Sequence, residues 1–121
     1  MAVSTLSIGQ ISSFLFQDTA NTNGAIAVKA SSASVSYIEC DNTANGSATY
    51  TKLYSLAAAS VVVGTTVPDT VIYVPASTLL KFPLPTAWVY GTALSVPSVT
   101  AGGTAGVTAP ATPITVRIAY T

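Results

Sequence analysis

The sequence predicts an all-β fold: a single-domain antiparallel β-sandwich, jelly-roll-like, with an extended N-terminal segment and a long Gly/Thr/Pro loop near the C-terminus. Three observations predict it. Apolar residues recur with a period of two, and no segment shows the 3.6-residue period of a helix with its caps. Ala, Thr, Ser and Val make up more than half of the 121 residues, and Thr and Val favour strands. Turn signals separate short strand candidates at roughly 8–12-residue intervals.

The first strand pattern covers residues 25–30, where Ile26 and Val28 alternate with Lys29. Residues 1–23 precede it and carry an apolar patch at Phe14, Leu15 and Phe16. Two interpretations of this segment stay open. It is either an arm that crosses onto a neighbouring subunit or a first strand docked on its own sheet.

The middle of the chain holds most of the strand candidates. In residues 49–56, Tyr50, Lys52 and Tyr54 share one face, and both faces are mixed, so one is expected to meet the core and the other a neighbour. The further predicted strands are residues 34–41, 60–63, 70–74, 78–82, 86–90 and 93–99. The separating turns are residues 21–24, 42–47, 67–69 and 83–85, all rich in Asn, Gly, Asp or Pro.

The last strand is the cleanest, because Ile114, Val116 and Ile118 all face one way in residues 114–120. Residues 101–113, rich in Gly, Ala, Thr and Pro, are predicted to form a long exposed loop or arm. The sequence shows neither a repeat nor a domain boundary, so residues 1–121 are expected to form one domain.

The composition excludes several functions. Only 7% of residues are charged, four basic against four acidic, whereas about 25% is usual. A surface with so little charge favours a subunit that neighbours cover. The chain has no His and one Cys, so His-based catalysis and Cys- or His-ligated metal sites are excluded. Four scattered cations cannot form a nucleic-acid footprint. We therefore expect no enzyme, no cofactor and no resident metal.

Membrane insertion and secretion are not predicted either. Residues 82–116 lack charge, but five Pro and four Gly residues interrupt them, which a transmembrane helix does not tolerate. Residues 1–17 lack the basic start and the apolar core of a secretion signal. The tripeptide Asn45-Gly46-Ser47 matches a glycosylation sequon, although a turn is the simpler interpretation.

Chemical candidates are few. Glu39 and Asp41 share a strand face, and together with Asp69 they are candidates for acid/base catalysis or for binding a cation. The simpler interpretation is a solvated strand end at which Asp41 caps the following turn. Cys40 is expected in the core, as is Trp88. For Tyr50 and Tyr54, core packing and an exposed binding face stay equally open.

One family resemblance joins several of these motifs. Its parts are residues 37–45 (YIECDNTAN), 48–54, 63–69 (VGTTVPD), 91–95, 103–106 and 116–120. Together they resemble small β-sandwich virion proteins of tailed bacteriophages, cyanophages among them, and within these the head decoration, or cement, proteins. The resemblance covers about residues 33–121. A tail, baseplate or fibre component of the same virions, with a glycan-binding surface, is the alternative.

The resemblance implies a non-enzymatic protein of the virion, assembled in the host cytoplasm. It would bind the major capsid protein and copies of itself, often as trimers, and neither nucleic acid nor membrane. The predicted contact residues are Phe14, Leu15 and Phe16 together with the Tyr50 and Tyr54 face.

Overall fold

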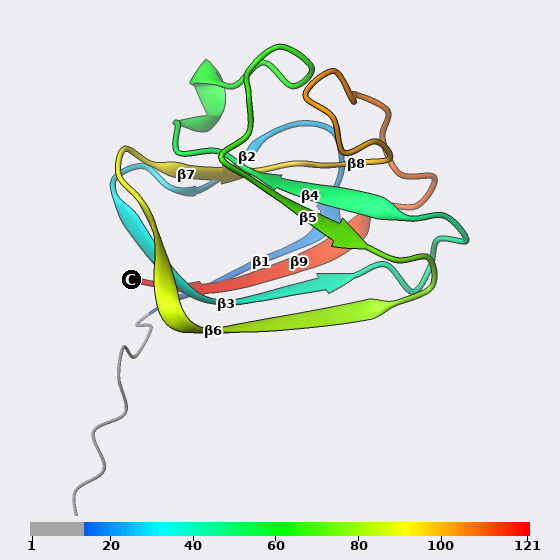
Figure 1. Cartoon of the computed structure of the whole chain (residues 1–121), viewed down its shortest axis with the longest axis horizontal. Helices are drawn as coiled ribbons and strands as arrows, with labels where there is room; N and C mark the ends of the chain where they lie inside the picture. The colour runs from blue at the N-terminus through cyan, green and yellow to red at the C-terminus, as the bar shows by residue number, and fades with distance from the viewer. Residues whose placement is uncertain (1–13) are drawn as a thin grey trace, which may run out of the picture.

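The computed structural model describes residues 14–121, which form an all-β sandwich as predicted (Figure 1). The described residues contain nine strands and one short 3₁₀ helix, η1, at Ala58–Ser60. The strands are β1 (Phe14–Asn21), β2 (Ile26–Lys29), β3 (Ala33–Asp41), β4 (Thr49–Leu53), β5 (Thr70–Val74), β6 (Leu79–Tyr90), β7 (Leu94–Val96), β8 (Ser98–Val99) and β9 (Ile114–Tyr120).

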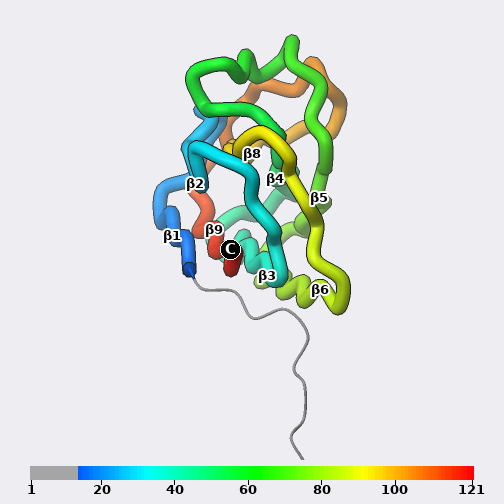
Figure 2. Tube along the Cα trace, turned by 90° about the vertical axis from the view of Figure 1, so that its left-hand side faces the viewer, coloured from blue at the N-terminus to red at the C-terminus, as the bar shows by residue number. Residues whose placement is uncertain are grey.

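The strands lie in two layers, which Figures 1 and 2 show from two sides. The first layer is a four-stranded sheet in the order β1-β9-β3-β6. The second combines the sheet β5-β4-β8 with the pair β2-β7. An antiparallel bridge between Tyr54 and Ser95 joins β4 to β7, so the second layer is continuous across both parts.

The connectivity is that of a jelly roll. Strand β4 pairs with β5, β3 with β6, β2 with β7 and β1 with β9, all antiparallel. The chain is therefore one long double-stranded ribbon that folds over itself, as in eight-stranded jelly rolls; here the strand after β6 is divided into β7 and β8. Folding the ribbon places β9 beside β3 and β8 beside β4, which completes the two sheets.

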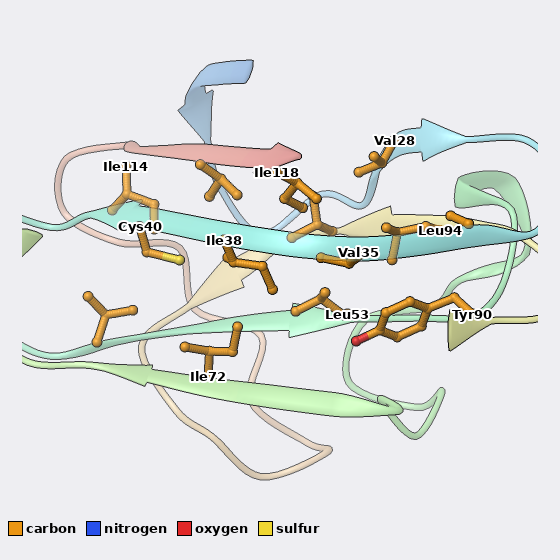
Figure 3. Packing of buried hydrophobic residues seen from close by; sticks show 14 residues of the cluster. Val28, Val35, Ile38, Cys40, Leu53, Ile72, Tyr90, Leu94, Ile114 and Ile118 are labelled. Carbon is orange, nitrogen blue, oxygen red and sulfur yellow. The ribbon is translucent and has the colours of Figure 1, made fainter. Parts of the chain in front are cut away.

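The core lies between the layers (Figure 3). All its residues are apolar and nearly or fully buried. The first layer contributes inward residues of β3 and β9: Val35, Ile38, Cys40, Ile114, Val116 and Ile118. The second layer contributes residues of β4, β5 and β7: Leu53, Ile72, Val74, Leu94 and Val96. The alternation predicted for β9 is thus confirmed, and so is the strand predicted at β3. Cys40 is completely buried in this cluster, as expected.

Three predicted elements differ from the structure. Residues 78–82 and 86–90 were predicted as two strands around a turn, but Pro83 and Pro85 lie within the single strand β6. Strand β6 is an edge strand, where a missing N–H is tolerated. The prediction of a strand at residues 60–63 is wrong, because the chain forms η1 and a loop there. Residues 93–99 divide at Pro97 into β7 and β8.

The start of the described chain is a strand docked on its own sheet. Residues Phe14 to Asp18 pair with β9 in antiparallel register, from Phe14 opposite Tyr120 to Asp18 opposite Val116. Of the two open interpretations of the N-terminal segment, the docked strand holds for this part. The rest of the predicted arm, residues 1–13, lies outside the described residues.

Two buried asparagines hold the β3–β4 turn to its surroundings. The Asn42 side-chain amide donates to the carbonyls of Ser47 and Pro75, both at 3.0 Å. The Asn45 amide donates to Asn42 Oδ1 at 2.9 Å and to the Thr112 carbonyl at 2.8 Å. Asn45 Oδ1 in turn accepts from the Thr112 amide at 2.8 Å. These bonds fit the turn interpretation of the Asn45-Gly46-Ser47 sequon, since the Asn45 amide is already engaged and buried.

Replacement of Asn45 tests this arrangement. Asn45→Ala removes one buried and two partly buried hydrogen bonds, each of which contributes about 1 kcal/mol net, so the free energy of unfolding is expected to fall by about 3 kcal/mol. Asn23→Ala is the matched control, because Asn23 makes one exposed side-chain hydrogen bond, to the Val107 carbonyl. Urea denaturation of both variants measures the difference, and equal losses would contradict the role given to Asn45.

The buried thiol predicts a pH dependence of stability. Burial raises the pKa of Cys40 from 9.0 to about 11. The unfolded chain therefore loses this proton before the folded chain does, and the thiol's contribution to stability is lost as the pH rises from 9 to 11. One pKa unit corresponds to about 1.4 kcal/mol, so the contribution amounts to about 2–3 kcal/mol.

Denaturation of the wild type and of Cys40→Ala at pH 9 and pH 11 isolates this contribution. Buried tyrosines such as Tyr54 also have raised pKa values, and they lower the stability of both proteins alike. The wild type is expected to lose more stability than the variant over this interval. An identical loss in the two proteins would show that the thiol does not contribute.

Candidate functional site: the interaction surfaces

The acidic residues do not come together. Glu39 forms an ion pair with Arg117 on the neighbouring strand β9 and accepts a hydrogen bond from the Tyr37 hydroxyl at 3.0 Å. Asp41 accepts from the hydroxyl and the amide of Thr43, and these hydrogen bonds hold the pKa of Asp41 below its ordinary value. Glu39 therefore has its partners on the sheet, and Asp41 has its partner in the turn that follows β3.

Asp69 lies elsewhere, in the connection between β4 and β5, where it accepts from the Ser55 amide at 2.6 Å. Within residues 14–121, no group of three or more acidic or Cys residues could hold a metal ion. Nor does any helix in this part of the chain have the length and apolar character to cross a membrane.

The Gly-rich loop after β8, residues 101–113, packs over β4, and we call it the cover. Lys52 is fully buried, and its ammonium group donates to the carbonyls of Gly103 at 2.7 Å and Gly106 at 3.0 Å. Burial lowers the pKa of Lys52. Residues 101–113 form a loop, as predicted, and most of them are exposed. The loop is nevertheless attached to the domain, because the buried Lys52 cation ties it to the outer face of the second layer.

Tyr50 lies beside this cover on the same face of β4. Gly102 packs so close to the Tyr50 ring that a Cβ on Gly102 would lie 2.7 Å from it, so only glycine fits there. The other side of Tyr50 contacts Tyr73 of β5, with ring centroids 5.4 Å apart. Tyr73 is 55% exposed, and Val71 on the same strand face is also exposed. We call Tyr50, Tyr73 and Val71 the tyrosine face.

Tyr54 does not belong to that face, which corrects the predicted Tyr50 and Tyr54 surface. Strand β4 ends at Leu53, and the Tyr54 side chain is fully buried. Burial raises the pKa of its hydroxyl, which has no hydrogen-bond partner among residues 14–121. A side chain enclosed in this way is not available for contact with another molecule.

The Phe14, Leu15 and Phe16 patch divides between two sides of β1. Leu15 is 64% exposed on the outer side. Phe14 stacks on Tyr120 of β9, with ring centroids 5.6 Å apart, and stays largely exposed. Phe16 packs against the core. Phe14 and Leu15 therefore remain available for contact, whereas Phe16 has a structural role.

Large apolar side chains outnumber charges on the surface of the described chain. Eleven of them are exposed, on both layers and on the loops. The whole sequence has eight charged residues, of which Lys52 is buried and Glu39 and Arg117 neutralise each other. The low charge read from the sequence is thus lower still on the folded surface.

A cleft of about 450 Å³ lies where the C-terminal half of β6 approaches the start of β5. Trp88, Tyr90, Asp69, Thr70 and Ser55 line it, together with Ala87 and Val89. Trp88 was expected in the core; it is only partly buried, and it packs against the core on one side and borders the cleft. This cleft could not be predicted from the sequence, because the segments that line it are 14 or more residues apart in the chain.

Comparisons of the chain with protein-family models, with curated proteins and with solved structures found no match.

Removal of the Lys52 charge tests the fastening of the cover. Lys52→Met keeps an unbranched buried side chain but removes both hydrogen bonds to the loop carbonyls. The amides of Thr100 and Gly106 form hydrogen bonds within the loop, so their exchange with solvent reports its opening. We expect their exchange to accelerate at least about tenfold, because the free energy of opening the loop falls by at least about 1.4 kcal/mol. Lys81→Met, at an exposed position, is the control and should leave these amides protected.

Proposed function

We propose that this chain is a structural virion protein that decorates the outside of a tailed-phage head and cements contacts between its capsomers. The observation that carries the proposal is the surface of the jelly roll. This surface presents eleven large apolar side chains, whereas the sequence has eight charged residues. Of these eight, Lys52 is buried, and Glu39 and Arg117 pair with each other. The resemblance of the strand and turn motifs to head decoration proteins supports the same interpretation.

The physical mechanism is cooperative burial of apolar surface. A stable interface buries about 1,200–2,000 Å² in total, and each Å² of apolar area contributes roughly 25 cal/mol before the cost of docking is subtracted. Many copies on one shell make modest individual contacts effective together. In the proposal each subunit binds the major capsid protein and other copies of itself, as trimers, across a seam in the shell.

Two surfaces are candidates for these contacts. The first is the β1 edge of the first layer, with Leu15 and Phe14. The second is the tyrosine face on the second layer. Because they lie on different layers, one subunit can contact two neighbours at once.

A single exposed residue tests the β1 contact. Leu15→Asp places a charge at the proposed interface. We expect the affinity of this variant for particles that lack the wild-type protein to fall at least about tenfold, which corresponds to about 1.4 kcal/mol of binding free energy. Val67→Asp is the matched control, since Val67 is equally exposed (71%) on the loop between β4 and β5. Equal binding of both variants would exclude Leu15 from the interface.

Deletion of the protein tests the function itself. Particles without it are expected to assemble but to release their genome at a lower temperature than wild-type particles. Deletion particles as resistant to heat as the wild type would overturn the cement proposal. Counting copies against the major capsid protein separates the alternative, a tail, baseplate or fibre component: a cement protein is present in hundreds of copies and a tail component in a handful.

A further inference from the structure

The cleft between β5 and β6 combines groups that suit one class of ligand. We propose that it binds a neutral saccharide, with a pyranose ring against Trp88 and a sugar hydroxyl donating to Asp69. This site does not depend on the proposed capsid function, and it uses none of the residues of the two proposed contact surfaces.

The first feature that favours a saccharide is an unused hydrogen-bond acceptor in the cleft. Asp69 uses one carboxylate oxygen, Oδ2, to accept from the Ser55 amide, and its other oxygen has no hydrogen-bond donor within residues 14–121. The cleft thus offers a charged acceptor beside the apolar side chains of Trp88 and Val89, which suits a sugar ring with its hydroxyls.

The groups that line the cleft are also held in place before a ligand arrives. The Asp69 amide donates to the Leu53 carbonyl at 2.9 Å, so the residue is fixed at its backbone as well as at its side chain. The hydroxyls of Thr70 and Tyr90 bond each other at 2.9 Å and join the two strands that border the cleft. The ring of Trp88 packs on Phe82 at 5.5 Å between centroids.

The walls also exclude other ligands. Neither Lys nor Arg lines the cleft, and Asp69 makes it negative, so phosphate esters and acidic sugars are repelled. Its lining mixes carboxylate and hydroxyl groups with apolar side chains, which disfavours a lipid. The volume of about 450 Å³ is within the range of small-molecule sites and accommodates one or two sugar rings.

Fluorescence gives a direct measurement, because Trp88 is the only tryptophan in the sequence. The purified full chain is titrated with maltose, cellobiose and N,N′-diacetylchitobiose, and with galacturonic acid as the anionic counterpart. At least one neutral disaccharide is expected to change the Trp88 emission saturably, with Kd on the order of 1 mM. Galacturonic acid should bind at least about fivefold more weakly, because Asp69 repels it.

Asp69→Asn separates binding from folding. The amide retains an oxygen that can accept from the Ser55 N–H, whereas the free acceptor becomes an NH₂ group, so saccharide affinity should fall at least about tenfold while the fold is kept. Asp41→Asn, on the outer face of the first layer, is the control and should leave the affinity unchanged. No saturable change with any of the three disaccharides, or full affinity in Asp69→Asn, would overturn the proposal.

Discussion

The structure depends on the insertion of the last strand into the middle of the first sheet. Strand β9 pairs with β1 on one side and with β3 on the other, so it joins the first described strand to the remainder of the layer. Without β9, β1 would have no neighbour, and the core would lose Ile114, Val116 and Ile118. Because β1 and β3 are distant from β9 in the sequence, pairing these strands closes long loops and costs chain entropy. We therefore expect this pairing to form late in folding.

The same long-range pairing explains which elements the sequence could predict. Strand prediction succeeded at β3, β5 and β9, since each has an apolar face toward the core, and the alternation was cleanest in β9. It failed at residues 60–63, where consecutive valines suggested a strand although no neighbouring strand is available. Pro83 and Pro85 suggested a turn because the sequence does not reveal that their strand lies at an edge.

The interaction surfaces were harder to predict than the strands. The carbonyl partners of Lys52 lie about 50 residues further along the chain, so its burial had no local signal. Tyr54 was placed on the face of Tyr50 by extrapolating a strand that ends one residue earlier. Leu15 and Tyr50 stay on or near the surface as candidates, but Tyr73 and the Trp88 cleft required the folded chain.

The proposed contacts and the proposed saccharide site are on separate parts of one sandwich. Strands β1 and β6 are the two edges of the first layer. A subunit that used the β1 edge against a shell would keep the β6 edge and its cleft open to solvent. Attachment to a particle and recognition of a ligand are therefore compatible within a single small domain.

The prolines of β6 have a consequence for a protein with so few charges. Strand β6 is the longest strand of the described chain and has an open edge, which is the geometry from which fibrils grow by addition of further strands. Charge repulsion between copies is too weak here to prevent such growth. Pro83 and Pro85 each remove an N–H donor from this strand and interrupt any ladder that a second chain could build on it. The two prolines therefore oppose the addition of further strands along this edge when copies of the chain meet.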